Sequence, residues 1–226
     1  MQRLKEVGSL ASRFWRGFGH KGPRGPEDGP PALVIPGFIA NDRTTTELRR
    51  ALAEAGFRVF PWREGMNFGA RPDTLERLRR AIDRCGNRGP VLLVGWSLGG
   101  LFAREIARAE PKRVRAVVTL GTPVWGDRRR YTNVWKLYER IAGHPVDKSP
   151  IPESPAKPPV PTLAIWSHRD GIVGVPSARG TEDTRDKAVE VSSSHMGFAV
   201  SKTGTRAAVR EIVRFLDEIE DSESQD

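Results

Sequence analysis

One five-residue pattern, Gly-Trp-Ser-Leu-Gly at residues 95–99, constrains the fold of this chain more than any other feature. It follows the apolar run of residues 91–94 and opens a stretch with helical spacing. Glycines on both sides of Ser97 remove the β-carbons that would collide if the chain turned sharply from strand to helix. Such a turn lifts a serine oxygen clear of the sheet, so Ser97 is predicted to be a nucleophile. The alternative is a glycine-rich turn that contains a serine by chance.

Short apolar, β-prone runs alternate with helical patterns along the rest of the chain. The predicted strands cover residues 32–35, 58–61, 91–94, 114–120, 162–166 and 188–191. The predicted helices cover residues 45–55, 72–84, 98–109 and 206–219. Strands that alternate with helices form parallel sheets, so we expect an α/β fold with a doubly wound, mostly parallel six-stranded sheet and helices on both faces. Ligands of such sheets bind beyond the carboxyl ends of the strands.

The 226 residues are predicted to form one domain with an extension at each end. Residues 1–31 combine a basic amphipathic pattern with a Gly- and Pro-rich linker, residues 32–221 form the domain, and residues 222–226 form a polar tail. Residues 124–160 interrupt the alternation of strands and helices and are predicted to form a small cap. No apolar run approaches the ~20 residues of a membrane-spanning helix, and the first thirty residues do not resemble a secretory signal.

The net charge of +9 reflects 37 Lys and Arg against 28 Asp and Glu. It favours contact with anionic surfaces, although many arginines stand beside acids in patterns typical of a solvated helix face. Residues 1–21 could lie on an anionic membrane, but docking on the domain or disorder is the favoured interpretation. No recognition motif accompanies the charge, which argues against nucleic acid as a partner.

The cysteine content of the chain indicates which cellular compartment suits it. Cys85 is the single cysteine, so an internal disulfide is excluded and a reducing environment fits the chain. We therefore expect a cytoplasmic protein, and peripheral contact with the membrane stays open as an alternative.

A nucleophilic serine needs a base and an acid that orients it. His195, one of four histidines, follows the last predicted strand, and Asp170 follows the predicted strand at residues 162–166. The order Ser97, Asp170, His195, each at a separate strand end, is the order expected for a catalytic triad in this architecture. Four other acids rank below Asp170, and the last two of them lie nearer His195 in sequence but follow no predicted strand: Asp147, Glu153, Asp183 and Asp186.

An oxyanion needs preorganised N–H donors, which we expect from the backbone of Leu98, after the nucleophile, and of Phe38, in the turn after the first strand. The alternative for Phe38 is an ordinary turn at the end of a strand. Aromatic residues near strand ends and in the predicted cap are candidates for an apolar substrate pocket, although those of the cap are equally consistent with burial of its own face. The pocket candidates are Trp62, Phe68, Trp96, Trp125, Trp135 and Tyr138.

Five segments resemble the α/β-hydrolase family, in particular its small lipase- and esterase-like members. These segments are residues 34–38, 94–100, 120–123, 167–173 and 194–197. The resemblance implies a triad of Ser97, His195 and Asp170, an acyl-enzyme intermediate and carboxylic-ester substrates. Two differences from the family pattern are Pro36, at a position where many lipases have a histidine, and the lack of two opening antiparallel strands before Ala32.

We therefore expect a serine hydrolase of the lipase and esterase type that acts on small-molecule or lipid-like esters and needs no metal or organic cofactor. The same residues could pass the acyl group to an alcohol, amine or thiol, or could cleave a thioester, so an acyltransferase or thioesterase is the first alternative. The second alternative is a non-catalytic basic protein that binds a membrane peripherally and recognises a partner.

Overall fold

The computed structural model describes residues 23–224 and joins six strands in one sheet. These strands are β1 (Pro31–Ile35), β2 (Arg58–Pro61), β3 (Val91–Trp96), β4 (Val114–Leu120), β5 (Thr162–Trp166) and β6 (Lys187–Glu190). They lie in the order β2-β1-β3-β4-β5-β6, and each neighbouring pair is parallel. The predicted α/β fold with its six-stranded parallel sheet is confirmed. Because all six strands run the same way, their carboxyl ends meet at one edge.

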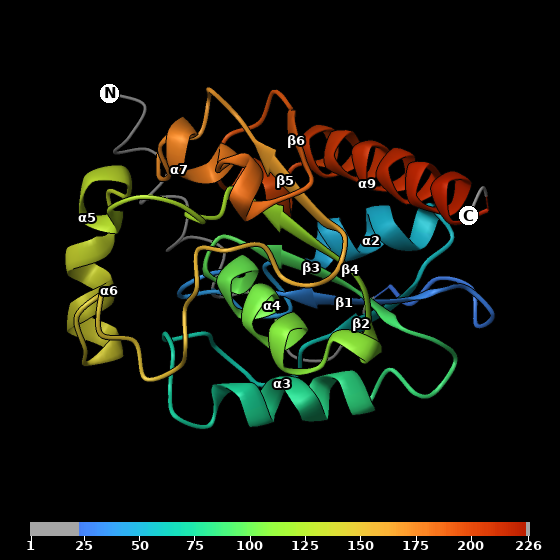
Figure 1. The fold of residues 1–226 in the computed structure, drawn as a ribbon, viewed down its shortest axis with the longest axis horizontal. Helices are drawn as coiled ribbons and strands as arrows, with labels where there is room; N and C mark the ends of the chain where they lie inside the picture. Colours follow the sequence, from blue (N-terminus) through green and yellow to red (C-terminus); the bar gives the residue numbers. More distant parts are fainter. Residues whose placement is uncertain (1–22, 225–226) are drawn as a thin grey trace.

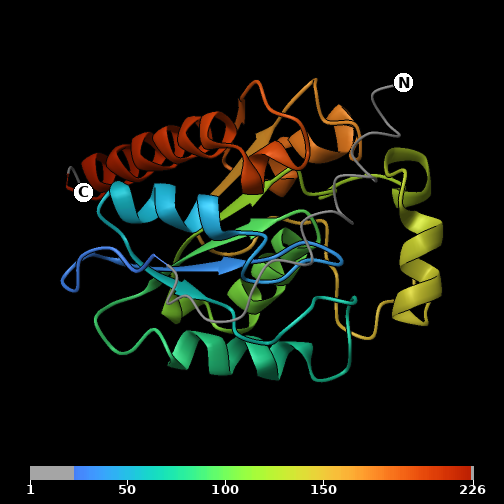
Figure 2. The ribbon, with the colours of Figure 1, turned by 180° about the vertical axis from the view of Figure 1, so that it is seen from behind.

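Helices cover both faces of the sheet (Figures 1 and 2). On one face lie α2 (Thr46–Glu54), α8 (Gly197–Val200) and α9 (Lys202–Glu223). On the other face lie α3 (Thr74–Asp83) and α4 (Leu98–Ala109). The chain adds β2 on one side of β1 and β3 on the other, and this reversal of direction carries the connecting helices to opposite faces.

Alternate residues of each strand enter two separate cores. In β1, Ala32 and Val34 pack toward α2 and α9, whereas Leu33 and Ile35 pack toward α3 and α4. Side chains of a strand point alternately to its two faces, so a strand covered on both faces needs apolar residues at every position. This requirement explains the continuous apolar runs in the sequence.

The last helix is longer than the predicted residues 206–219. It begins at Lys202 because the side chain of Ser201 accepts a hydrogen bond from the N–H of Gly204. It continues to Glu223, whose carboxylate is bonded to Arg115 at 2.7 Å, and so takes in part of the predicted polar tail. The predicted amphipathic segment at residues 1–21 lies outside the described residues. Among the described helices, none has the length and apolar character needed to cross a membrane.

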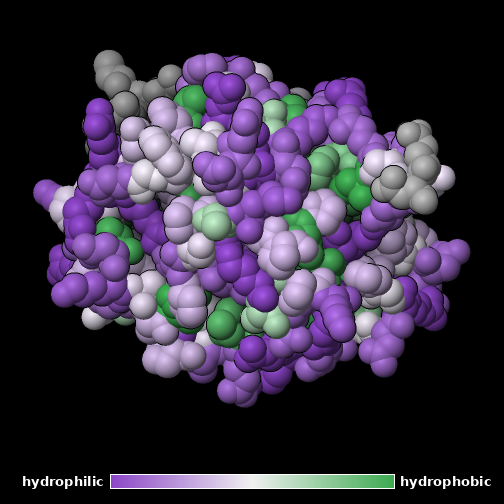
Figure 3. Space-filling model, viewed as in Figure 1, coloured by the Kyte–Doolittle hydropathy of each residue, from purple (hydrophilic) through white to green (hydrophobic). Residues whose placement is uncertain are grey.

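The predicted cap region begins after β4 with α5 (Arg128–Tyr131) and α6 (Trp135–Ala142), followed by an irregular run to residue 161. Both helices lie beyond the carboxyl ends of the strands, at the left of Figure 1. The remaining short helices are η1 (Pro111–Arg113), α7 (Val175–Arg179) and η2 (Glu182–Thr184). The face seen in Figure 3 is mainly hydrophilic, with hydrophobic residues in small separate groups.

A buried arginine of α4 attaches the irregular run to the domain. The guanidinium of Arg104, 1% exposed, donates to the carbonyl oxygens of Thr184 at 2.7 Å and of Pro155 and Ala156 at 2.8 Å each. Burial lowers the pKa of Arg104 to about 10, so it remains charged at neutral pH. The carbonyl groups of Thr184 and Pro155 thus depend on this one side chain for their hydrogen bonds, whereas that of Ala156 also accepts one from Arg108.

Replacing Arg104 by methionine should therefore destabilise the domain. Arg104→Met keeps an unbranched apolar side chain but leaves the carbonyl groups of Thr184 and Pro155 without their donor, and we expect a loss of about 3 kcal/mol in the free energy of unfolding. Urea denaturation measures this loss, with the exposed Arg214→Met on α9 as the control. A loss for Arg104→Met no larger than for the control would contradict this role.

Candidate active site

Ser97 occupies a strained turn between β3 and α4. Its backbone has φ 55° and ψ −123°, a conformation that residues with a β-carbon seldom adopt. Two bonds from the neighbouring strand hold it there: the N–H of Ser97 donates to the carbonyl oxygen of Leu120 at 2.8 Å, and the hydroxyl of Thr122 donates to the carbonyl oxygen of Ser97 at 2.8 Å. Observed strain of this kind is typical of a functional site.

The glycines around Ser97 are required by close contacts. A β-carbon on Gly95 would lie 2.4 Å from the Cα of Gly100, and one on Gly99 would lie 2.2 Å from the carbonyl oxygen of Ile35. One on Gly100 would lie 2.1 Å from the Thr122 hydroxyl. The turn therefore fits only because these three positions have no side chain.

Asp170 and His195 meet beside this turn. The Oδ2 atom of Asp170 lies 2.8 Å from Nδ1 of His195, and its Oδ1 atom accepts hydrogen bonds from the N–H groups of Ile172 and Val173, each at 2.8 Å. The side chain of Asp170 is fully buried and that of His195 is 5% exposed. A carboxylate held in this way orients the imidazole and fixes which of its nitrogens carries the proton.

The Nε2 atom of His195 and the hydroxyl of Ser97 both remain without a hydrogen bond to any other described residue, and neither is fully buried. Residues 120 and 121 contact the backbone of Ser97 and the side chains of Asp170 and His195, since the Leu120 carbonyl oxygen accepts the hydrogen bond from the N–H of Ser97. A β-carbon on Gly121 would lie 2.7 Å from Oδ2 of Asp170 and 3.1 Å from Nδ1 of His195. Trp96 supports the imidazole, with its ring 5.5 Å from that of His195 and its N–H donating to the His195 carbonyl at 3.0 Å.

The two predicted oxyanion donors belong to segments next to the serine. Leu98 is the first residue of α4, and the turn of Gly37 and Phe38 packs against Ser97, because a β-carbon on Gly37 would lie 3.1 Å from the Ser97 Cβ. Among the described residues neither the N–H of Phe38 nor that of Leu98 has an acceptor. Both are therefore available for a ligand.

Asn67 and Thr122 also shape this site, although sequence reasoning assigned them no role. Asn67 is 1% exposed, and its amide donates to the carbonyl oxygen of Pro36 at 2.8 Å. Thr122 holds the Ser97 carbonyl as described above. Neither residue stands out in the sequence except by position: Asn67 lies between Gly65 and Gly69, and Thr122 lies two positions after the end of β4.

The six aromatic pocket candidates occupy different environments. Trp62 and Trp96 are 3% and 2% exposed and belong to the two cores, whereas Phe68 and Trp125 are 41% and 39% exposed. Trp135 lies on α6 beneath the guanidinium of Arg129. Tyr138, also on α6, packs its ring 5.2 Å from that of Phe38. Tyr138 thus lies beside a predicted oxyanion donor.

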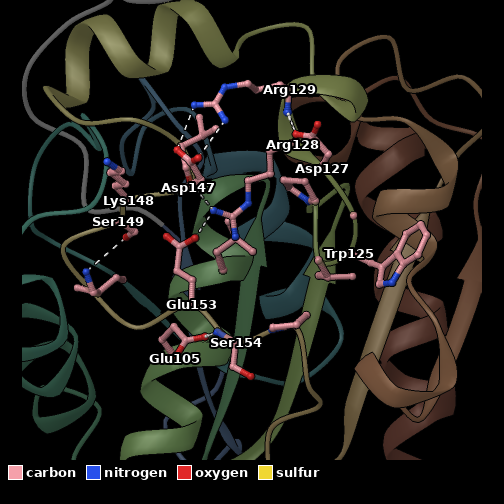
Figure 4. Close-up of a pocket in the computed structure, with 17 residues that line it drawn as sticks. Glu105, Trp125, Asp127, Arg128, Arg129, Asp147, Lys148, Ser149, Glu153 and Ser154 are labelled. Atoms are coloured by element: carbon pink, nitrogen blue, oxygen red, sulfur yellow. Dashed lines mark hydrogen bonds and ion pairs between the residues drawn. The ribbon is translucent and has the colours of Figure 1, made fainter.

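A cavity of about 530 Å³ lies between α4 and the predicted cap. Its lining includes Trp125 from the pocket candidates and Leu101, one turn along α4 from Ser97. Figure 4 shows Arg128 directed toward Glu153 and Arg129 toward Asp147 within the wall. The wall therefore combines apolar side chains with charges that neutralise each other.

Comparison with known proteins identifies the family. The alpha/beta hydrolase fold family matches residues 15–144, more than half of the chain. The chain therefore belongs to the α/β-hydrolase family, as the sequence motifs predict.

Solved structures share the fold at low sequence identity. The naproxen esterase (carboxylesterase NP) of Bacillus subtilis is 16% identical with a TM-score of 0.55, and 95% of each chain is covered. MGS-MChE2, an α/β-hydrolase enzyme from the metagenome of sediments of the Mar Chica lagoon in Morocco, is 19% identical with a TM-score of 0.61, covering 89% of this chain and 100% of that one. A bacterial membrane phospholipase A is 19% identical with a TM-score of 0.61, covering 87% of this chain and 81% of that one.

A curated protein matches part of the sequence. Polyketide synthase ThaQ of Burkholderia thailandensis is 29% identical over 100 residues, or 42% of this chain. This chain spans about 5% of the length of that curated relative.

The contact between Gly100 and Thr122 can be tested by a double-mutant cycle. Gly100→Ala should lower the free energy of unfolding by about 2 kcal/mol because the new β-carbon overlaps the Thr122 hydroxyl, although alanine ordinarily stabilises a helix relative to glycine. Thr122→Ala alone should cost about 1 kcal/mol through the lost bond to Ser97. In the double variant the loss should be smaller than the sum, because the overlapping oxygen is gone. Thermal or urea denaturation measures each loss, and strict additivity would contradict the proposed overlap.

Proposed function

We propose that this protein is a serine hydrolase that cleaves carboxylic esters through an acyl-enzyme intermediate. The observation that carries the proposal is the buried hydrogen bond of 2.8 Å between Asp170 and His195, formed beside a serine whose backbone is held in a strained turn. A general base needs an imidazole with a fixed orientation, and an aspartate that is itself held on Oδ1 by two N–H groups and binds the imidazole through Oδ2 supplies it.

In the proposed reaction the Ser97 oxygen attacks the ester carbonyl carbon while Nε2 of His195 accepts the serine proton. The carbonyl oxygen becomes an oxyanion, which the N–H groups of Phe38 and Leu98 stabilise. The bond to the alcohol oxygen then breaks, and His195 returns the proton to the leaving alcohol. Water attacks the acyl-enzyme in the same way, which releases the carboxylic acid and restores Ser97. This step requires the Ser97 hydroxyl to reach Nε2 of His195, and no other described residue is hydrogen-bonded to that hydroxyl.

Removing the serine oxygen should abolish this chemistry. Ser97→Ala should lose fluorophosphonate labelling and reduce hydrolysis of p-nitrophenyl esters by at least about 10⁴-fold, because no acyl-enzyme can form. Mass spectrometry of the labelled wild-type protein should locate the adduct on Ser97. The control is Ser222→Ala, a serine on α9, which should keep full activity. Equal hydrolysis by Ser97→Ala and wild type would refute the proposed function.

The cavity beside α4 is the proposed binding place for part of the substrate. Its apolar lining comes from Leu101, Val124, Val146 and Ile151. Its volume suits a small ligand, and the paired charges in its wall favour esters with short chains over long hydrocarbons. Short esters are also the natural first substrates to assay.

A bulky residue in this cavity should weaken binding without slowing the chemical step. Ser149→Trp narrows the cavity and should raise KM for p-nitrophenyl butyrate by about fivefold while kcat stays close to that of wild type, because the lost contacts are made equally in the ground state and transition state. Steady-state kinetics measures both constants, with Ser222→Trp as the control. An unchanged KM would show that the substrate binds elsewhere.

A further inference from the structure

Asn67 joins the loop of the predicted oxyanion donor to the rest of the fold by three hydrogen bonds. Its backbone N–H donates to the carbonyl oxygen of Ala40 at 2.8 Å, and its carbonyl oxygen accepts from the N–H of Ile39 at 2.7 Å. Its side-chain amide donates to the carbonyl oxygen of Pro36 at 2.8 Å. Asn67 therefore binds this loop on both sides of Phe38.

The side chain of Asn67 is itself fixed. It is 1% exposed, and its Oδ1 atom accepts a hydrogen bond from the N–H of Gly69 at 3.2 Å. With oxygen and nitrogen both bonded, the amide has a single orientation that satisfies its partners. The donor to Pro36 is thus held in place rather than free to rotate.

These bonds determine where the N–H of Phe38 points. That N–H belongs to the peptide group between Gly37 and Phe38, and the two peptide groups next to it are those bound by Asn67 through Pro36 and Ile39. The carbonyl oxygen of Gly37 is bonded to the N–H of Ala40 at 3.2 Å. Ile39 has φ 51°, which is strained for a β-branched residue and needs such support. The donor is therefore oriented without an acceptor of its own.

The segment that carries Asn67 also contacts α6. A β-carbon on Gly69 would lie 2.6 Å from the Cβ of Ala142, and the N–H of Ala70 donates to the Tyr138 hydroxyl at 3.3 Å. The Tyr138 ring packs at 5.2 Å from the Phe38 ring. Burial raises the pKa of Tyr138 to about 12, so its hydroxyl is neutral at physiological pH. Helix α6 thus touches both the loop and the segment that holds it.

We propose that Asn67 is a positioning residue that aims the N–H of Phe38 at the oxyanion, and that Tyr138 braces the same loop from α6. The inference rests on the proposed function, because it assigns Asn67 a part in the ester reaction. An oxyanion donor contributes only when it points at the charge that develops in the transition state, so a small rotation of this peptide group should slow catalysis without loss of substrate binding.

The first test replaces one donor atom. Asn67→Asp keeps the shape and the acceptor for Gly69 but puts an oxygen opposite the Pro36 carbonyl oxygen. We expect kcat for p-nitrophenyl butyrate to fall by about 10²-fold, the effect of losing one oxyanion donor, with KM within about twofold of wild type. Inhibition by a trifluoromethyl ketone should weaken by a similar factor, because the adduct that it forms with the serine oxygen is a hemiketal with an oxyanion. The control is Asn87→Asp, an exposed asparagine between α3 and β3.

The second test addresses Tyr138 and does not depend on the folding of the Asn67 variant. Tyr138→Ala removes the ring beside Phe38 and should lower kcat by about tenfold with little change in KM, whereas Leu137→Ala, on the exposed face of the same helix, should change neither. A rise in KM at constant kcat would instead make Tyr138 part of the substrate pocket and overturn its bracing role.

These outcomes separate the inference from the proposed function. If fluorophosphonate fails to label wild-type Ser97, the proposed function fails and the positioning role fails with it. If wild type is labelled while a folded Asn67→Asp variant keeps its kcat and its inhibitor affinity, the hydrolase stands and the positioning role is refuted. Thermal denaturation establishes that the variant is folded, and if Asn67→Asp is unfolded, the same measurements are made on Asn67→Ala, which removes the donor to Pro36 without placing an oxygen opposite it.

Discussion

The candidate site depends on the strained backbone of Ser97 being held by the neighbouring strand. A left-handed φ of 55° at a residue with a side chain costs on the order of 1–3 kcal/mol and persists only when surrounding contacts fix it. Here the contacts are the Leu120 carbonyl and the Thr122 hydroxyl, both supplied by β4 and its extension. Pairing of β3 with β4 is thus a condition for the turn, and the glycines next to Ser97 make the close approach of α4 sterically allowed.

Much of the fold could be predicted from the sequence because its signals are local. Strands buried on both faces are continuous apolar runs, and the predicted strands at residues 58–61, 114–120 and 162–166 coincide with β2, β4 and β5. The order of Ser97, Asp170 and His195 at strand ends also places them at one edge of a parallel sheet. The observed 2.8 Å contact between Asp170 and His195 agrees with that reasoning, although their catalytic roles remain a proposal.

Contacts between distant segments could not be predicted in the same way. Asn67 is a polar residue in a loop, and only the fold brings its amide to Pro36, which lies 31 positions earlier. The aromatic character of a residue does not predict whether it lines a pocket, since a tryptophan packs in a hydrophobic core as readily as against a ligand. Trp62 is buried with its ring N–H bonded to the carbonyl oxygen of Gly65, whereas Trp125 is exposed beside the cavity. Burial and hydrogen bonding, which depend on packing, decide between these environments.

The site consists of two parts that meet at the end of β4. Asp170 and His195 come from the loops after β5 and β6, whereas Ser97 and the donors Phe38 and Leu98 come from the ends of β3 and β1. Residues 120–122 contact both parts: they bind Ser97 on one side, and on the other Gly121 packs against Asp170 and His195 and donates its N–H to β5 at 2.9 Å. A displacement of this segment would therefore move Ser97 relative to His195, its proposed base. The absence of a side chain at Gly121 is what allows Asp170 and His195 to pack against this segment.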